Sequence, residues 1–70
     1  MSNMTLTGQT WVAIGPAGVV GSIHRIEGGF TYKLMSDAGF RAVYPTLEAA
    51  KGALYSSLLP GSDWPDFREH

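Results

Sequence analysis

The sequence predicts an α+β domain: a three- to four-stranded antiparallel meander with one C-terminal helix packed on one face. Three observations predict this fold. Short runs of β-branched and aromatic residues recur about every ten residues. Glycine-containing turns separate the runs, and such short connections suit antiparallel strands because parallel strands need longer crossovers. One stretch with apolar residues at three- and four-residue spacing follows the last run and predicts a single helix.

Four segments are strand candidates, and they lie inside one domain that we expect to span residues 10–60. The candidates are 11–14 (WVAI), 19–26 (VVGSIHRI), 30–35 (FTYKLM) and 40–44 (FRAVY). A small polar stretch precedes them, so we expect residues 1–9 to be a flexible leader. The alternation in the second segment is imperfect because Arg25 shares its parity with Ile23. A β-bulge near Gly21, or a bend, would resolve this.

The alternation of side chains predicts one polar and one apolar face of the sheet. The polar face should carry Ser22, His24, Thr31, Lys33 and Arg41. The apolar face should receive the helix and should carry Ile23, Tyr32, Leu34, Ala42 and Tyr44.

The helix should begin just after Pro45, where Thr46 can cap it by accepting a hydrogen bond from a free backbone N–H group. Its apolar stripe consists of Leu47, Ala50, Leu54 and Leu58. Pro60 and Gly61 should end it. Residues 61–70 then form a C-terminal tail that contains two large aromatic residues.

Length, charge and cysteine content exclude several classes of protein. The chain has 70 residues, a formal net charge of −1 and no cysteine. These values exclude a disulfide framework, a cysteine-based zinc site and a thiol nucleophile. No apolar run approaches the ~18 residues of a membrane span, and no basic segment precedes an apolar leader, so we expect a soluble cytoplasmic protein. The near-neutral charge provides little general attraction to nucleic acids or anionic membranes.

The residues that could carry catalysis do not form a recognisable constellation. Ser22 and His24 should share a strand face, but no G-x-S-x-G elbow accompanies them. The acidic residues lie in turns, on the helix and in the tail, so no carboxylate pair is predicted. The histidines have no metal-ligand spacing. We therefore expect a protein that is not an enzyme and holds no metal or cofactor.

The strand-to-helix junction resembles that of a DNA-binding family. The segment 44–50 (YPTLEAA) is similar to the F-x-T-x-x-E-A junction of AP2-like folds, which include the arm-binding domains of tyrosine integrases. The resemblance covers about residues 11–58. It implies that the sheet face enters the DNA major groove, with contacts from His24, Arg25, Lys33 and Arg41. Integrase arms are basic, whereas this chain has five Lys and Arg against six acidic residues.

A second resemblance covers most of the chain. The segments WVAIGP, GGFTYKL, YPTLEAAKGAL and DWPDF are similar to segments in the sequences of small accessory proteins of actinobacteriophages, particularly mycobacteriophages. Such proteins often act on host proteins. The resemblance therefore implies a host-directed binding role in the cytoplasm of a bacterial cell.

Two groups of residues favour a protein partner. A strip of small residues on the helix consists of Ala49, Gly52, Ala53 and Ser56. Glycine inside a helix costs up to ~1 kcal/mol relative to alanine. The strip therefore indicates either close approach of the helix to its own sheet or a helix contact in a homodimer.

The second group is aromatic: Trp11, Trp64 and Phe67. The tail can fold back so that Trp64 and Phe67 cap the core, or these two side chains can anchor a partner protein. The same two alternatives apply to Trp11.

We predict a non-enzymatic protein-interaction domain, a phage-encoded modulator or inhibitor of a host protein. A DNA-binding sheet face is the alternative.

Overall fold

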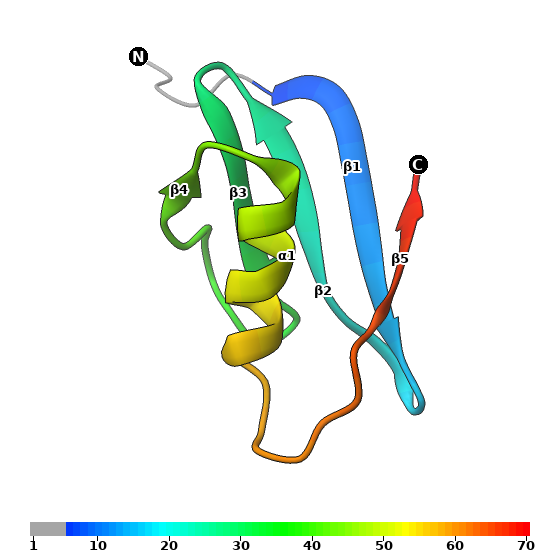
Figure 1. Ribbon diagram of the computed structural model, residues 1–70. Coiled ribbons are helices and arrows are strands. Elements are labelled where there is room, and N and C mark those ends of the chain that lie inside the picture. Colours follow the sequence, from blue (N-terminus) through cyan, green and yellow to red (C-terminus); the bar gives the residue numbers. More distant parts are fainter. Residues whose placement is uncertain (1–5) are drawn as a thin grey trace.

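The fold is a five-stranded antiparallel sheet with one helix on one face, seen in a computed structural model that describes residues 6–70 (Figure 1). The elements in chain order are β1 (Leu6–Gly15), β2 (Gly18–Ile26), β3 (Gly29–Leu34), β4 (Val43–Tyr44), α1 (Leu47–Ser56) and β5 (Asp66–Glu69). The strand order across the sheet is β4-β3-β2-β1-β5. The α+β class with an antiparallel sheet is confirmed, but the expectation of three or four strands is wrong.

The additional strand comes from the predicted tail. After α1 the chain passes the end of the helix to the far edge of the sheet, where β5 runs antiparallel to β1 (Figure 1). Trp11 lies opposite Glu69, and Ile14 lies opposite Asp66. The segment DFRE is short and mostly charged, so its own residues give little strand signal. The long β1 provides the partner that turns it into a strand.

Two strand boundaries differ from expectation. Residues 6–9 lie in β1 rather than in a leader, while residues 1–5 lie outside the described part of the chain. The strand expected over 40–44 is reduced to β4, although the Arg41 N–H still donates to the Tyr32 carbonyl at 2.8 Å. The Thr31 hydroxyl donates to the carbonyls of Arg41 and Ala42, each at 3.0 Å. These side-chain bonds hold the chain beside β3 without a regular ladder.

A β-bulge interrupts the pairing of β1 with β2. Ala13 lies opposite Gly21 and Ile14 lies opposite Val19, so Val20 is the extra residue on β2. An irregularity near Gly21 was expected, but this one precedes both Ile23 and Arg25 and therefore leaves them on the same face of the sheet. Val20 consequently packs against the edge of the core.

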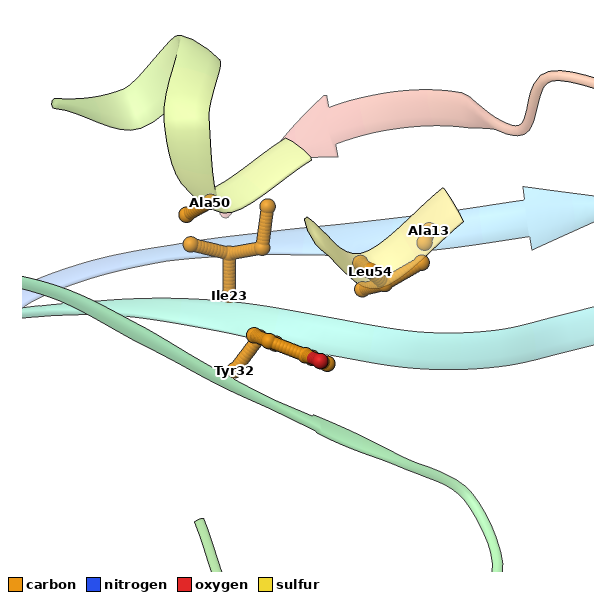
Figure 2. Packing of buried hydrophobic residues seen from close by; sticks show 5 residues of the cluster. All are labelled: Ala13, Ile23, Tyr32, Ala50 and Leu54. Carbon is orange, nitrogen blue, oxygen red and sulfur yellow. The ribbon is translucent and has the colours of Figure 1, made fainter. Parts of the chain in front are cut away.

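The core lies between α1 and the sheet (Figure 2). Ile23, Ala13 and Tyr32 contribute from the sheet, and Ala50 and Leu54 contribute from the helix. Thr46 caps α1 as expected, because its side chain accepts a hydrogen bond from the Ala49 N–H at 3.1 Å. The expected helix-facing residues Leu34 and Tyr44 pack against this core, whereas Ala42 is exposed.

Small residues in the sheet allow Leu54 to pack closely. A Cβ atom on Gly21 would lie 2.7 Å from the Lys33 carbonyl oxygen and 3.3 Å from Leu54 Cδ1. Ala13 is the neighbour of Gly21 across the β1–β2 ladder and is also fully buried. The two small residues therefore leave a hollow in the sheet that the Leu54 side chain fills.

One expected polar position is not solvated. Thr31 is fully buried, at 0% exposure, although it was expected on the solvated face. Its hydroxyl is satisfied by the two carbonyls of the segment that follows β3. Burial of the hydroxyl is tolerated because its single proton has these carbonyl oxygens as acceptors in place of water.

Two glycine substitutions should have opposite effects on stability. Gly21→Ala should lower the free energy of unfolding by at least about 1 kcal/mol, because the new methyl group would clash with the backbone of β3. Gly52→Ala should raise it by up to ~1 kcal/mol, because a Cβ atom there meets nothing within 4 Å and alanine favours the helix. Urea unfolding measures both changes. A Gly21→Ala protein as stable as the native chain would contradict the close approach of β3 to position 21.

Leu54→Ala tests the packing of α1 on the sheet. It should lower the free energy of unfolding by about 2–5 kcal/mol, because it leaves a cavity in the core. The control is Leu59→Ala, at a position where the side chain is mostly exposed, and its unfolding curve should stay close to that of the native protein.

Candidate functional site

The segment after α1 carries a large exposed aromatic side chain. Trp64 is 54% exposed, and its ring packs against Tyr55 at a centroid distance of 4.9 Å and against Phe67 at 5.9 Å. Phe67 also packs against the core, and the Lys51 ammonium lies 5.2 Å from its ring centroid. We call Tyr55, Trp64 and Phe67 the aromatic cluster. It is anchored on the core at Phe67 and open to solvent at Trp64.

Hydrogen bonds fix the segment that carries Trp64. The Tyr55 hydroxyl donates to the Ser62 carbonyl at 3.0 Å. The Ser62 backbone N–H and hydroxyl both donate to the Leu59 carbonyl, at 3.1 and 2.7 Å. Pro65 is buried. These bonds tie residues 59–62 to one another and to the end of α1, while Leu59 stays 81% exposed.

A pocket of about 380 Å³ lies between this segment and the turn that joins β1 to β2. Residues 15–17 and Val20 line one side, and Leu58, Leu59, residues 61–63 and Pro65 line the other. Asp63 is the charged residue in this lining. Such an apolar recess can accept an aliphatic or aromatic group, and its lining contains no paired acid and base for catalysis.

The partner-binding residues expected from sequence separate into two places. Trp64 and Phe67 come together in the aromatic cluster, as their rings are in contact. Trp11 is partly buried on β1, where its ring lies 5.8 Å from that of Phe30 and packs against the core. Sequence reasoning missed Tyr55. Its position outside the apolar stripe of the helix is the signal that could have identified an exposed aromatic residue.

His24 lies within a small network of hydroxyl groups. Ser22 Oγ is 2.9 Å from His24 Nε2, and Thr10 Oγ1 is 3.3 Å from Nδ1. The Phe40 ring packs edge-on against the imidazole at 4.8 Å. Ser22 and His24 thus share a face, as expected, but a hydroxyl occupies the place where a catalytic triad has the carboxylate that stabilises an imidazolium.

Burial lowers the pKa of His24 below its usual value of 6.5, and the positive charge of Lys33 lowers it further. His24 is therefore neutral at neutral pH. The two hydroxyl contacts and the Phe40 contact make it a packing residue of the helix-free face.

The basic residues of the alternative DNA-binding surface do not share one face. Arg25 lies opposite Phe30, on the side of the sheet that α1 covers, and its guanidinium is 5.9 Å from the Phe30 ring centroid. Lys33 lies opposite Ser22 on the other side, 5.3 Å from the Phe40 ring centroid. The register therefore separates two of the charges that a sheet-face DNA reader would use together.

Arg41 is held by an acidic neighbour. Its guanidinium donates to both carboxylate oxygens of Asp37, at 2.7 and 3.1 Å. The bond from Arg41, followed by that from the Leu34 backbone N–H, lowers the pKa of Asp37 to about 2. Much of the Arg41 charge is thus neutralised within the chain.

The strip of small residues on α1 is only partly explained by the fold. Ala53 packs against the core, Ala49 is partly buried and Ser56 is exposed. Close approach of the helix to its sheet does not explain Gly52, because a Cβ atom there would meet nothing within 4 Å. The glycine that the close approach requires is Gly21. A dimer contact through this strip stays a prediction.

Comparison with family models, with curated protein sequences and with solved structures finds no match to this chain. Among residues 6–70, no helix is long and apolar enough to cross a membrane. The same residues contain no group of three His, Cys, Asp or Glu side chains placed to hold a metal ion.

The state of His24 leads to a prediction on pH. Because its pKa is lower in the folded chain than in the unfolded chain, the unfolded chain takes up the proton first as the pH falls through 6.5. The free energy of unfolding should therefore fall between about pH 7.5 and pH 5.5. Below that range, the ionised Asp37 carboxylate stabilises the folded chain because its pKa is lowered from 3.8 to about 2. Its contribution to the free energy of unfolding should be lost as the pH falls from 3.8 toward about 2.

Thermal unfolding at these two pH values measures the effect. His24→Gln should flatten the decrease in Tm between pH 7.5 and pH 5.5, while His70→Gln, at an exposed position, should leave it unchanged. If His24→Gln shows the same decrease as the native protein, His24 does not control stability in this range.

Proposed function

We propose that this chain is a non-enzymatic protein-interaction domain that binds a partner protein through the segment after α1, with Trp64 as the anchoring side chain. The observation that carries the proposal is the exposure of Trp64 on a fixed aromatic base. Tryptophan is among the residues most enriched at the centres of protein–protein interfaces, because it buries a large area with few rotatable bonds.

The rigidity of the segment favours binding. An exposed side chain on a mobile loop loses conformational entropy when it binds, and this loss weakens the complex. Here the Tyr55 hydroxyl and the two Ser62 bonds constrain the chain before Trp64, and the Tyr55 and Phe67 rings pack against its indole. More of the apolar contact energy of Trp64 is therefore available for affinity.

The neighbouring pocket indicates what kind of partner surface fits. Leu59 projects beside an apolar recess of about 380 Å³. A partner that inserts one apolar side chain into this recess, and covers Leu59 and Trp64, would bury both exposed side chains in one interface. Each large apolar side chain buried in this way contributes about 1.5–3 kcal/mol.

The resemblance to actinobacteriophage accessory proteins supports a bacterial host protein as the partner. In this proposal the domain acts in the cytoplasm of the host cell and modulates or inhibits the protein that it binds. A DNA-binding sheet face is less favoured, because Arg25 and Lys33 lie on opposite sides of the sheet.

Affinity capture with matched variants tests this function. The native protein, Trp64→Ala and Leu59→Ser are immobilised and exposed to nuclease-treated actinobacterial lysate, and bound proteins are quantified by mass spectrometry. We expect one stoichiometric partner on the native protein and at least a tenfold loss of it on each variant, which corresponds to about 1.4 kcal/mol. Val43→Ser is the control, because Val43 is exposed and apolar but lies in β4 at the other edge of the sheet.

The Tm of each variant decides between an anchor and a core residue. A Trp64→Ala protein that keeps a near-native Tm and loses the partner supports the proposal. A fall in Tm comparable to that of Leu54→Ala would instead place Trp64 in the core. In an untreated lysate run in parallel, capture of nucleoid proteins that are absent after nuclease treatment would favour the DNA-binding alternative.

A further inference from the structure

The edge of the sheet at β5 has backbone groups directed away from β1. The His70 N–H donates to the Thr10 carbonyl at 2.7 Å, so the backbone of His70 faces β1. Because backbone groups alternate along a strand, Arg68 and Asp66 face β1 in the same way. Phe67 and Glu69 therefore direct their N–H and C=O groups outward, where another strand can pair with them.

The two edges of the sheet are not equivalent. β4 at the opposite edge has only two residues. β5 has four residues and lies beside the aromatic cluster, to which it contributes Phe67. The β5 edge is thus the better site for adding a strand.

The charges on β5 are of mixed sign and exposed. The Asp66 carboxylate and the Arg68 guanidinium form an ion pair at 2.9 Å, and their side chains are 61% and 69% exposed. They lie on the same face of the strand because they are two residues apart. An ion pair this exposed stabilises the single chain little, so both groups can also interact with a second strand.

These charges select one way in which two copies of β5 can pair. Outward-facing residues must lie opposite outward-facing residues. In one register, Phe67 lies opposite Phe67 of the partner subunit. Asp66 then lies opposite Arg68 of the partner subunit, and Arg68 lies opposite Asp66 of the partner subunit. If Phe67 instead lies opposite Glu69 of the partner subunit, the two Arg68 side chains face each other and repel. The strand is therefore self-complementary in one register.

We propose that this chain forms a homodimer in which β5 pairs antiparallel with β5 of a second copy, with Phe67 at the two-fold axis. The two sheets then form one continuous sheet, joined by reciprocal backbone bonds at Phe67 and by two Asp66–Arg68 pairs between subunits. The interface is isologous, as a two-fold dimer requires. It uses the sheet edge rather than the small-residue strip on α1, and it goes beyond binding of a host protein.

Charge reversal followed by mixing tests this pairing. Sedimentation equilibrium should give the native protein twice its chain mass of 7.5 kDa. Asp66→Arg and Arg68→Asp should each weaken self-association at least about tenfold, because each places like charges opposite one another across the axis. An equimolar mixture of the two variants should form heterodimers, since every cross-strand pair is then of opposite charge.

Two further variants separate this pairing from other effects. The double variant D66R/R68D should dimerise like the native chain, because it restores opposite charges in both positions. Glu69→Arg changes the charge of β5 by the same amount as Asp66→Arg but lies on the other face of the strand, so it should leave the dimer intact. Leu59→Ser should also keep the dimer mass, which distinguishes this interface from the partner-binding segment. Circular dichroism of each variant establishes that it is folded.

A native protein that sediments as a single chain at all concentrations would overturn the proposal. So would a dimer that survives both single charge reversals, or single-reversal variants that fail to associate on mixing. The last result would mean that Asp66 and Arg68 do not face each other across an interface.

Discussion

The contact of Leu54 with the hollow at Gly21 and Ala13 is the constraint on which the rest of the structure depends. It sets α1, which ends at Ser56, directly on the sheet, with Ile23 and Tyr32 in the same core (Figure 2). From that end the chain must pass to the far edge of the sheet to pair with β1. A side chain at position 21 would clash with the Lys33 carbonyl oxygen of β3 and would crowd the end of the Leu54 side chain.

The aromatic cluster follows from that geometry. Tyr55 lies on the last turn of α1, and Phe67 lies on β5, so Trp64 between them can contact both only if the helix lies close to the sheet. Phe67 therefore packs both against the core and against Trp64 of the proposed binding surface. A small domain buries a limited fraction of its surface, and using the same aromatic residue in both places makes efficient use of few large side chains.

The proposed partner surface and the proposed dimer interface lie next to each other along the chain. Residues 58–64 carry the first, and residues 66–69 carry the second. A dimer through β5 would present two copies of the Trp64 segment on one rigid body. Such an arrangement raises the effective affinity for a partner that is itself symmetric or repeated, because the second contact forms intramolecularly.

Local sequence signals determined the antiparallel α+β class and the helix with its Thr46 cap, because each depends on neighbouring residues. Alternation also placed Ser22 and His24 on one face. Only the tertiary structure decided that DFRE is a strand, that Thr31 is buried and that Gly21 rather than Gly52 makes room for the helix. Each of these depends on a contact between residues far apart in the chain: β1 beside the tail, the segment after β3 over Thr31, and Leu54 over the sheet. Periodicity within one segment carries no information about such contacts, since it reports which face is apolar and not what covers it.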